Sequence, residues 1–183
     1  YLFAVNVPMS ILEHTGHMID EAEKKKLYEQ VVGYMNNAIA LNPRLASPYY
    51  YLARVQGLVP ADIIPAGTKS PEEYYKMALH LEPMHIGARM ELLKIAKERG
   101  ATLDEQIAII EPGLGFTYNV SVVEGYYSEA ARLYLENKNY GKAKQIMERM
   151  YLFKTRSDYS LVRQNTSIPQ ALMGGEAIFQ GGR

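Results

Sequence analysis

The side chains best suited to bind a metal or to move a proton are histidines, and their spacing is poor for either task. His14 and His17 lie three residues apart, so on a helix they would share a face with Glu13 or Asp20. A protein metal site needs three or four convergent ligands, and the sequence holds no His-Glu-x-x-His pattern. We therefore expect no bound metal.

Other patterns that carry chemistry are also absent from the sequence. The chain has no cysteine, which excludes disulfides, thiolate zinc sites and cysteine nucleophiles. The glycine-rich stretches 113–115 and 174–175 follow no predicted strand, so they lack the context of a phosphate-binding loop. No serine lies in a nucleophile-elbow pattern, and Glu72 with Glu73 is typical of a solvated helix surface. We expect a protein that is not an enzyme and needs no cofactor.

The composition is that of a globular chain with balanced charge. Of 183 residues, 48% are hydrophobic, and 20 basic residues offset 20 acidic ones. Nucleic-acid binders usually carry a basic surplus that neutralises phosphates, so we expect no nucleic-acid partner. The sequence opens on Tyr1, which favours a piece of a longer protein. Residues 1–5 are apolar but far short of the roughly 20 needed to span a membrane.

That apolar start has two interpretations. The favoured one is a lead-in that packs on the first helices, and the alternative is the stub of a membrane tether or signal peptide that precedes this sequence.

Helix signals follow one another along most of the chain, and no segment alternates as a strand would. We expect the main helices over residues 20–41, 46–58, 70–81, 85–99, 102–111, 120–137 and 140–153. Shorter helices are expected within 9–19 and 158–163, and prolines predict a loop over 59–69. The class is therefore all-α, with a lead-in over 1–19, a helical domain over 20–153 and a partly irregular extension over 154–183.

Two helix ends share one sequence pattern, which indicates an internal repeat. Residues 38–43 read Ala-Ile-Ala-Leu-Asn-Pro, and residues 78–83 read Ala-Leu-His-Leu-Glu-Pro. The separation of Pro43 and Pro83 falls within the periods of 20–50 residues that are typical of solenoid proteins.

The clearest single unit runs from Tyr127 to Met150. Along it, aromatic and small residues fall where two helices must interlock: Tyr127, Ala130, Ala131, Tyr134, Tyr140, Ala143, Met147 and Met150. A second unit has the same order and an insertion of about six residues beyond the usual 34; it is carried by Tyr49, Leu52, Ala53, Tyr75, Ala78 and Pro83. This order resembles the tetratricopeptide repeat family. The resemblance implies antiparallel helix pairs, about three to four of them, stacked in a right-handed solenoid.

The resemblance also implies a concave groove lined by the first helix of each pair. Rotation away from the core positions predicts six groove residues, namely Tyr50, Arg54, Met90, Lys94, Ser128 and Arg132. The three cations recur at the same place in successive units, and such a line suits an acidic peptide or a terminal carboxylate. The alternative is that they are ordinary exposed helix cations that nearby glutamates neutralise: Glu91, Glu98 and Glu129.

Two functions are compatible with this sequence. The leading expectation is a non-catalytic scaffold that binds a protein or peptide partner, an acidic one if the groove cations take part. The alternative is the soluble repeat tail of a bacterial membrane-bound glycan polymerase or O-antigen ligase type enzyme, with catalysis elsewhere in the full chain. The extracytoplasmic, periplasmic side is favoured over the cytoplasm. The oligomeric state stays open, because degenerate outer repeats sometimes pack on a second copy.

Overall fold

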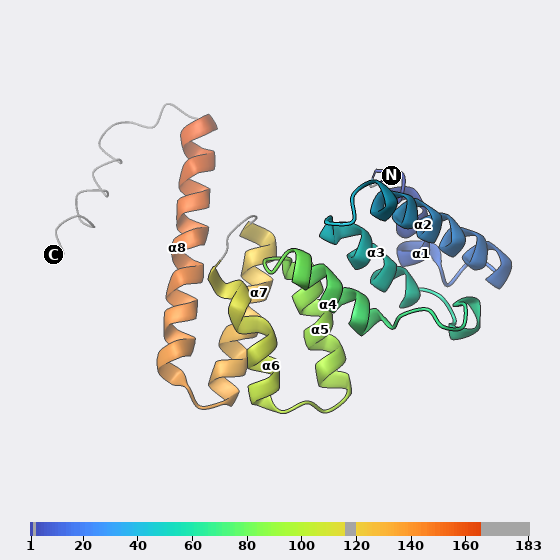
Figure 1. The fold of residues 1–183 in the computed structure, drawn as a ribbon. Coiled ribbons are helices and arrows are strands. Elements are labelled where there is room, and N and C mark those ends of the chain that lie inside the picture. Colours follow the sequence, from blue (N-terminus) through green and yellow to red (C-terminus); the bar gives the residue numbers. More distant parts are fainter. Residues whose placement is uncertain (2, 116–119, 166–183) are drawn as a thin grey trace. The chain divides into compact units, whose positions relative to one another are not determined.

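The computed structural model describes residues 1, 3–115 and 120–165, and it describes side chains for 1, 3–115 and 124–152. Throughout these residues the regular structure is helical, which confirms the all-α class (Figure 1). The chain divides into two compact units, Tyr1–Phe116 and Thr117–Arg183. The predicted helical domain, 20–153, includes parts of both.

Six α-helices form the first unit. They are α1 (Asn6–Thr15), α2 (Glu21–Leu41), α3 (Ala46–Gln56), α4 (Pro71–Leu81), α5 (Ile86–Glu98) and α6 (Leu103–Ile110), with the 3₁₀ turns η1 (Ala61–Ile63) and η2 (Glu111–Gly115). Each helix packs against the next one along the chain (Figure 1). The second unit contains α7 (Val120–Glu136) and α8 (Tyr140–Asn165), which pack against each other.

Local sequence explains where several helices begin. Ser70 caps α4 through a capping box, in which its hydroxyl oxygen accepts from the Glu73 N–H at 3.3 Å and the Glu73 carboxylate accepts from the Ser70 N–H at 2.8 Å. Thr102 caps α6 in the same way. Asp20 caps α2 by accepting from the Glu23 N–H at 2.8 Å. These caps satisfy N–H groups that the first helical turn leaves unpaired.

The core of the first unit has two parts that meet at α3. One part gathers apolar residues of the lead-in, α1, α2 and α3: Val5, Met9, Leu12, Leu27, Tyr28, Val31, Met35, Leu52 and Val55. The other joins α3 to α4 and α5: Ala46, Tyr49, Ala53, Tyr75, Ala78, Ala88 and Leu92. The alanines in the second part let neighbouring helices approach closely, while tyrosine and leucine fill the space beside them.

In the lead-in, the apolar residues are not all buried. Val5 is fully buried, whereas Phe3 is 90% exposed. The lead-in therefore anchors on the core through Val5. None of the helices in the described part of the chain is long and apolar enough to cross a membrane.

The second unit is built on aromatic and small residues, as its sequence predicts. Tyr127, Ala130, Ala131, Tyr134 and Ala143 are buried. The predictions for Tyr140 and Met147 were wrong, because these residues are 65% and 49% exposed. The face of α8 that meets α7 instead follows a stripe of three- and four-residue steps, through Ala143, Ile146 and Met150.

The last helix also differs from its prediction. The sequence predicted an end at Phe153 and a separate short helix over 158–163, but α8 runs without a break to Asn165. Residues 154–163 contain neither proline nor glycine, so nothing in them interrupts the helical hydrogen bonds. The rest of the predicted extension, 166–183, lies outside the described residues.

Candidate functional site

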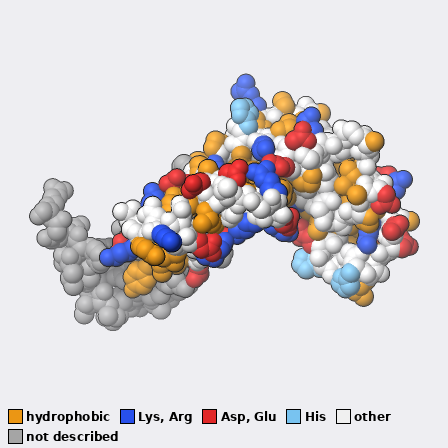
Figure 2. Space-filling model, turned by 90° about the horizontal axis from the view of Figure 1, so that it is seen from below, with side chains coloured by type: hydrophobic (Ala, Val, Ile, Leu, Met, Phe, Trp, Pro, Cys, Tyr) orange, Lys and Arg blue, Asp and Glu red, His pale blue; other side chains and the backbone are white. Residues whose placement is uncertain are grey.

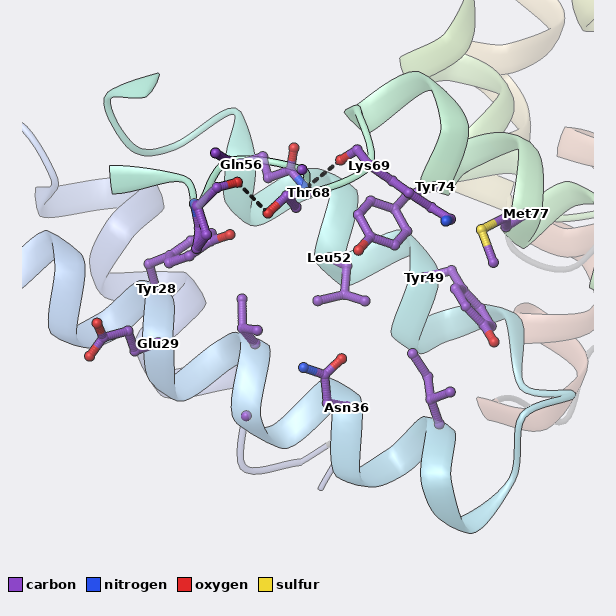
Figure 3. Close-up of a pocket in the computed structure, with 16 residues that line it drawn as sticks. Tyr28, Glu29, Asn36, Tyr49, Leu52, Gln56, Thr68, Lys69, Tyr74 and Met77 are labelled. Atoms are coloured by element: carbon purple, nitrogen blue, oxygen red, sulfur yellow. Dashed lines mark hydrogen bonds between the residues drawn. The ribbon is translucent and has the colours of Figure 1, made fainter. Parts of the chain in front are cut away.

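An open cavity of about 670 Å³ lies in the first unit between α2, α3, α4 and the loop that precedes α4 (Figure 3). Apolar side chains line much of it: Val32 and Ile39 of α2, Leu52 of α3 and Met77 of α4. Sites that hold a small molecule usually have volumes of roughly 300–1,000 Å³, with mostly apolar walls and a few placed polar groups. The cavity therefore has the size and lining of a binding site.

The loop between α3 and α4 forms one wall of this cavity. Gly67 adopts a positive φ of 82°, a conformation that glycine reaches without strain. The Thr68 hydroxyl donates to the Pro65 carbonyl at 2.7 Å, and the Gln56 side-chain N–H donates to the Lys69 carbonyl at 3.0 Å. The first bond closes a turn within the loop and the second joins the loop to the end of α3, so residues 65–69 form an ordered wall (Figure 3).

Two tyrosines point into the cavity from neighbouring helices, Tyr28 from α2 and Tyr74 from α4 (Figure 3). Only 4% of Tyr28 is exposed, yet within the described residues neither hydroxyl makes a hydrogen bond. No fully enclosed side-chain polar atom of the described part lacks a partner, so both hydroxyls open onto the cavity. Tyr49, by contrast, donates its hydroxyl to the Pro43 carbonyl at 3.3 Å.

Both open hydroxyls remain protonated at neutral pH. Burial raises the pKa of Tyr28, and its neighbour Tyr74 adds to the rise. Burial likewise raises the pKa of Tyr74, helped by Glu73 and Tyr49. A phenol in this state can both donate and accept a hydrogen bond.

Gln56 supplies a third polar group to the cavity. The residue is 6% exposed, and its amide N–H is used by the loop. Within the described residues its carbonyl oxygen has no hydrogen bond, so it is left as an acceptor. The charged residues of the lining, Glu29 and Lys69, have opposite signs and are exposed. The polar groups inside the cavity are therefore neutral, and the charged residues of its lining lie at exposed positions.

The predicted groove residues of α3 lie in a second aromatic group, which we call the Tyr50 cluster: Tyr50, Tyr51, Arg54, Tyr75 and His85. Ring centroids lie 5.7 Å from Tyr50 to Tyr51, 5.8 Å to Tyr75 and 4.6 Å to His85. The Arg54 guanidinium carbon lies 5.6 Å from the centroid of the Tyr50 ring, within cation–π range.

The charge of Arg54 is already matched within the first unit. Arg54 forms an ion pair with Glu13 of α1, and both side chains are partly buried. Burial lowers the pKa of Arg54, but Tyr50, Glu13 and Glu91 outweigh that effect and raise it. A ligand carboxylate at this position would have to compete with Glu13.

The other predicted groove residues have different surroundings. Met90 of α5 is half-buried and Lys94 is exposed, and within the described residues Lys94 has no ion pair. In the second unit, Arg132 pairs with Glu129 at 2.7 Å and with Glu136. The Ser128 hydroxyl lies 3.5 Å from the Met150 sulfur. The sequence alternative, in which glutamates neutralise the cations, thus applies to Arg132. The groove itself stays a prediction.

None of the cavity residues was among the predicted site residues. Two signals pointed to them: the insertion at 59–69, and the paired tyrosines at 49–50 and 74–75. In each pair the first tyrosine lines the cavity and the second belongs to the Tyr50 cluster. The prediction from the sequence considered only the groove side of α3, and Tyr49 lies on the other side of that helix.

The histidines show no arrangement that could bind a metal. The His14 ring is hydrogen-bonded through Nδ1 to the Ser10 carbonyl at 2.9 Å, and His85 caps α5 by accepting from the Ala88 N–H at 3.1 Å. In the described part of the chain, no three side chains of His, Asp or Glu cluster as metal ligands would.

Comparison with known proteins adds no relative. No family model matches the chain, and no curated protein sequence matches it.

Proposed function

We propose that this chain is a non-catalytic scaffold that binds a protein or peptide partner on tetratricopeptide-like helix pairs. Three observations support the repeat interpretation. Helices α1 to α6 pack in chain order, the end of α2 shares its sequence pattern with the end of α4, and alanines lie at the buried helix contacts. Units of this kind cannot cover their apolar faces alone, and stacking leaves extended surfaces suited to a partner.

The observation that carries the proposal is the open cavity of the first unit. Three hydrogen-bonding atoms of its lining are used by no described group and open onto the cavity: the Tyr28 and Tyr74 hydroxyls and the Gln56 carbonyl oxygen. A partner that supplied these bonds would gain affinity from groups that the fold itself leaves unused. A helical protein that only had to be stable would not need such an arrangement.

The predicted groove residues form a second proposed contact surface, and their charges determine which partner this surface would favour. Of the predicted groove cations on the first unit, Arg54 is paired and Lys94 has no ion pair. An acidic partner would therefore gain most from Lys94, and Tyr50 and Met90 would offer apolar contact beside these cations.

Peptide selection tests the proposal directly. The purified chain is immobilised and exposed to a display library of random 12-residue peptides, and enriched sequences are synthesised with blocked ends. We expect peptides whose binding is saturable by calorimetry. If repeated selections enrich no sequence above an empty-surface control, the scaffold function is wrong.

The same peptides separate the two surfaces. If an acidic partner uses the groove residues of the first unit, replacing Lys94 with alanine weakens the binding of acidic peptides, and unchanged affinity in Lys94→Ala removes that surface from the proposal. Lys25→Ala, a change at an exposed helical cation of α2, serves as the control.

A further inference from the structure

We propose that the cavity between α2, α3 and α4 binds a proline-rich segment in the polyproline II conformation. This inference rests on the proposed scaffold function and names the class of peptide that the cavity takes. Three properties of the cavity support it: its hydrogen-bonding groups, its aromatic lining and its charge.

The hydrogen-bonding groups match a ligand that is rich in acceptors. A polyproline II segment makes no internal hydrogen bonds, so its carbonyl oxygens all face outward. Proline has no N–H, which leaves the ligand with more acceptors than donors. The Tyr28 and Tyr74 hydroxyls have no partner among the described residues and can donate to such carbonyls. The Gln56 carbonyl oxygen can accept from a non-proline residue of the segment.

The aromatic lining matches the side chains of such a segment. Tyr28, Tyr49 and Tyr74 come from three different helices and line one cavity over an apolar floor that includes Leu52. Polyproline II ligands dock in grooves lined by aromatic side chains, against which the proline rings pack. Their stiffness also reduces the entropy lost on binding.

The charge of the cavity selects against strongly charged peptides. Glu29 and Lys69 are exposed and opposite in sign. An acidic segment would be attracted by Lys69 and repelled by Glu29. A basic segment would be attracted by Glu29 and repelled by Lys69. A neutral segment avoids both penalties, because it brings no charge into a site whose interior holds only neutral groups.

Gly33 offers a way to close the cavity without disturbing the fold. It lies on the cavity side of α2, and a Cβ added there would meet no atom within 4 Å. Gly33→Leu therefore places a side chain in the open space, and leucine also favours the helix over glycine. Gly125 of α7 is helical and equally open, so Gly125→Leu is the matched control.

The test uses random 12-residue peptides selected on the unchanged chain and then synthesised with blocked ends. We expect the enriched peptides to carry prolines at a spacing of three. Their dissociation constants should rise about tenfold or more in Gly33→Leu and in the double variant Tyr28→Phe with Tyr74→Phe. Gly125→Leu should bind as the unchanged chain does, and circular dichroism should show that all variants remain helical.

The other outcomes each overturn a defined statement. Enriched peptides without proline, if their binding is lost in Gly33→Leu, would overturn the polyproline class. Peptides that bind all variants equally would show that the cavity is not the binding site, and the proposed scaffold function would remain. Failure to enrich any peptide would overturn both.

Discussion

The cavity and the Tyr50 cluster both include tyrosines of α3 and α4, and the cavity adds Tyr28 of α2, yet the two groups use their polar atoms differently. In the Tyr50 cluster, Arg54 is paired with Glu13, and His85 caps a helix. In the cavity, the Tyr28 and Tyr74 hydroxyls have no partner among the described residues. Tyrosines adjacent in sequence belong to different groups, Tyr49 and Tyr74 to the cavity and Tyr50 and Tyr75 to the cluster. The presence of tyrosine in the sequence therefore does not distinguish the two groups.

The difference separates a group that stabilises the fold from one that is open to a ligand. Polar groups that already have partners contribute to folding and resist a new ligand, because the ligand must first replace those partners. Polar groups without partners contribute little to folding and can be used on binding. Changes at Tyr50, Arg54 and His85 should therefore lower stability, whereas removal of the Tyr28 and Tyr74 hydroxyls should not.

The Tyr50 ring gives the largest expected effect. Tyr50→Ala removes contacts with three rings, so we expect the free energy of unfolding to fall by about 2 kcal/mol. Phe3→Ala, at a side chain that is 90% exposed, should change it by less than about 0.5 kcal/mol. Urea denaturation followed by circular dichroism measures both, and equal effects would contradict the stabilising role of the Tyr50 ring.

The ion pair of the Tyr50 cluster gives the next effect. Arg54→Ala leaves Glu13 without its partner in a partly buried position, and we expect a loss of about 1–2 kcal/mol. Arg132→Ala removes an arginine that is 44% exposed on its own helix, for which about 0.5 kcal/mol is expected. A double-mutant cycle with Glu13→Gln should show coupling to Arg54 only. No coupling would mean that the pair is not formed in solution.

The helix cap at His85 should make stability depend on pH. Burial lowers the pKa of His85, although Glu82 opposes the shift. The neutral ring accepts the Ala88 N–H, and a protonated ring cannot. Its stabilising effect is therefore present above the unfolded pKa of about 6.5 and is lost as the pH falls through the lower folded value.

Unfolding measured between about pH 8 and 5 tests this dependence. His85→Ser keeps a capping side chain without a titrating ring and should flatten the profile relative to the unchanged chain. His80→Ser, at an exposed position of α4, should leave the profile as it was. A profile that His85→Ser does not alter would contradict the role of this cap.

The cavity hydroxyls should give the smallest effect on stability. Tyr28→Phe and Tyr74→Phe remove hydroxyls that have no partner among the described residues, so each should change the free energy of unfolding by less than about 0.5 kcal/mol. Tyr49→Phe removes a hydrogen bond to the Pro43 carbonyl and should cost about 1 kcal/mol. A large loss at Tyr28 would show that its hydroxyl has a structural partner.

The helices could be predicted from the sequence because their signals are local. Ser70, Thr102 and Asp20 determine helix starts through bonds that reach only three residues along the chain. The same locality explains the error in α8, where the predicted end at Phe153 had no proline, glycine or capping residue to enforce it.

The contacts that decide the sites could not be predicted, because they join distant parts of the chain. Glu13 meets Arg54 only after α1 and α3 are placed. Arg89 looks like any helix arginine in the sequence, yet it is 8% exposed and donates to the carbonyls of Pro83 at 3.0 Å and Ile109 at 2.9 Å. The cavity likewise needs the loop, α2 and α4 together, although the insertion and the tyrosine pairs were visible.

The loop before α4 has a consequence for how this chain could change over time. Residues 65–69 form a wall of the cavity, but they lie outside the helices that carry the core. Loops accept substitutions and length changes more readily than packed helices do. Variation in this one segment would therefore reshape the cavity wall while the helical framework stays the same, so the proposed recognition could diversify at little cost to the packed core.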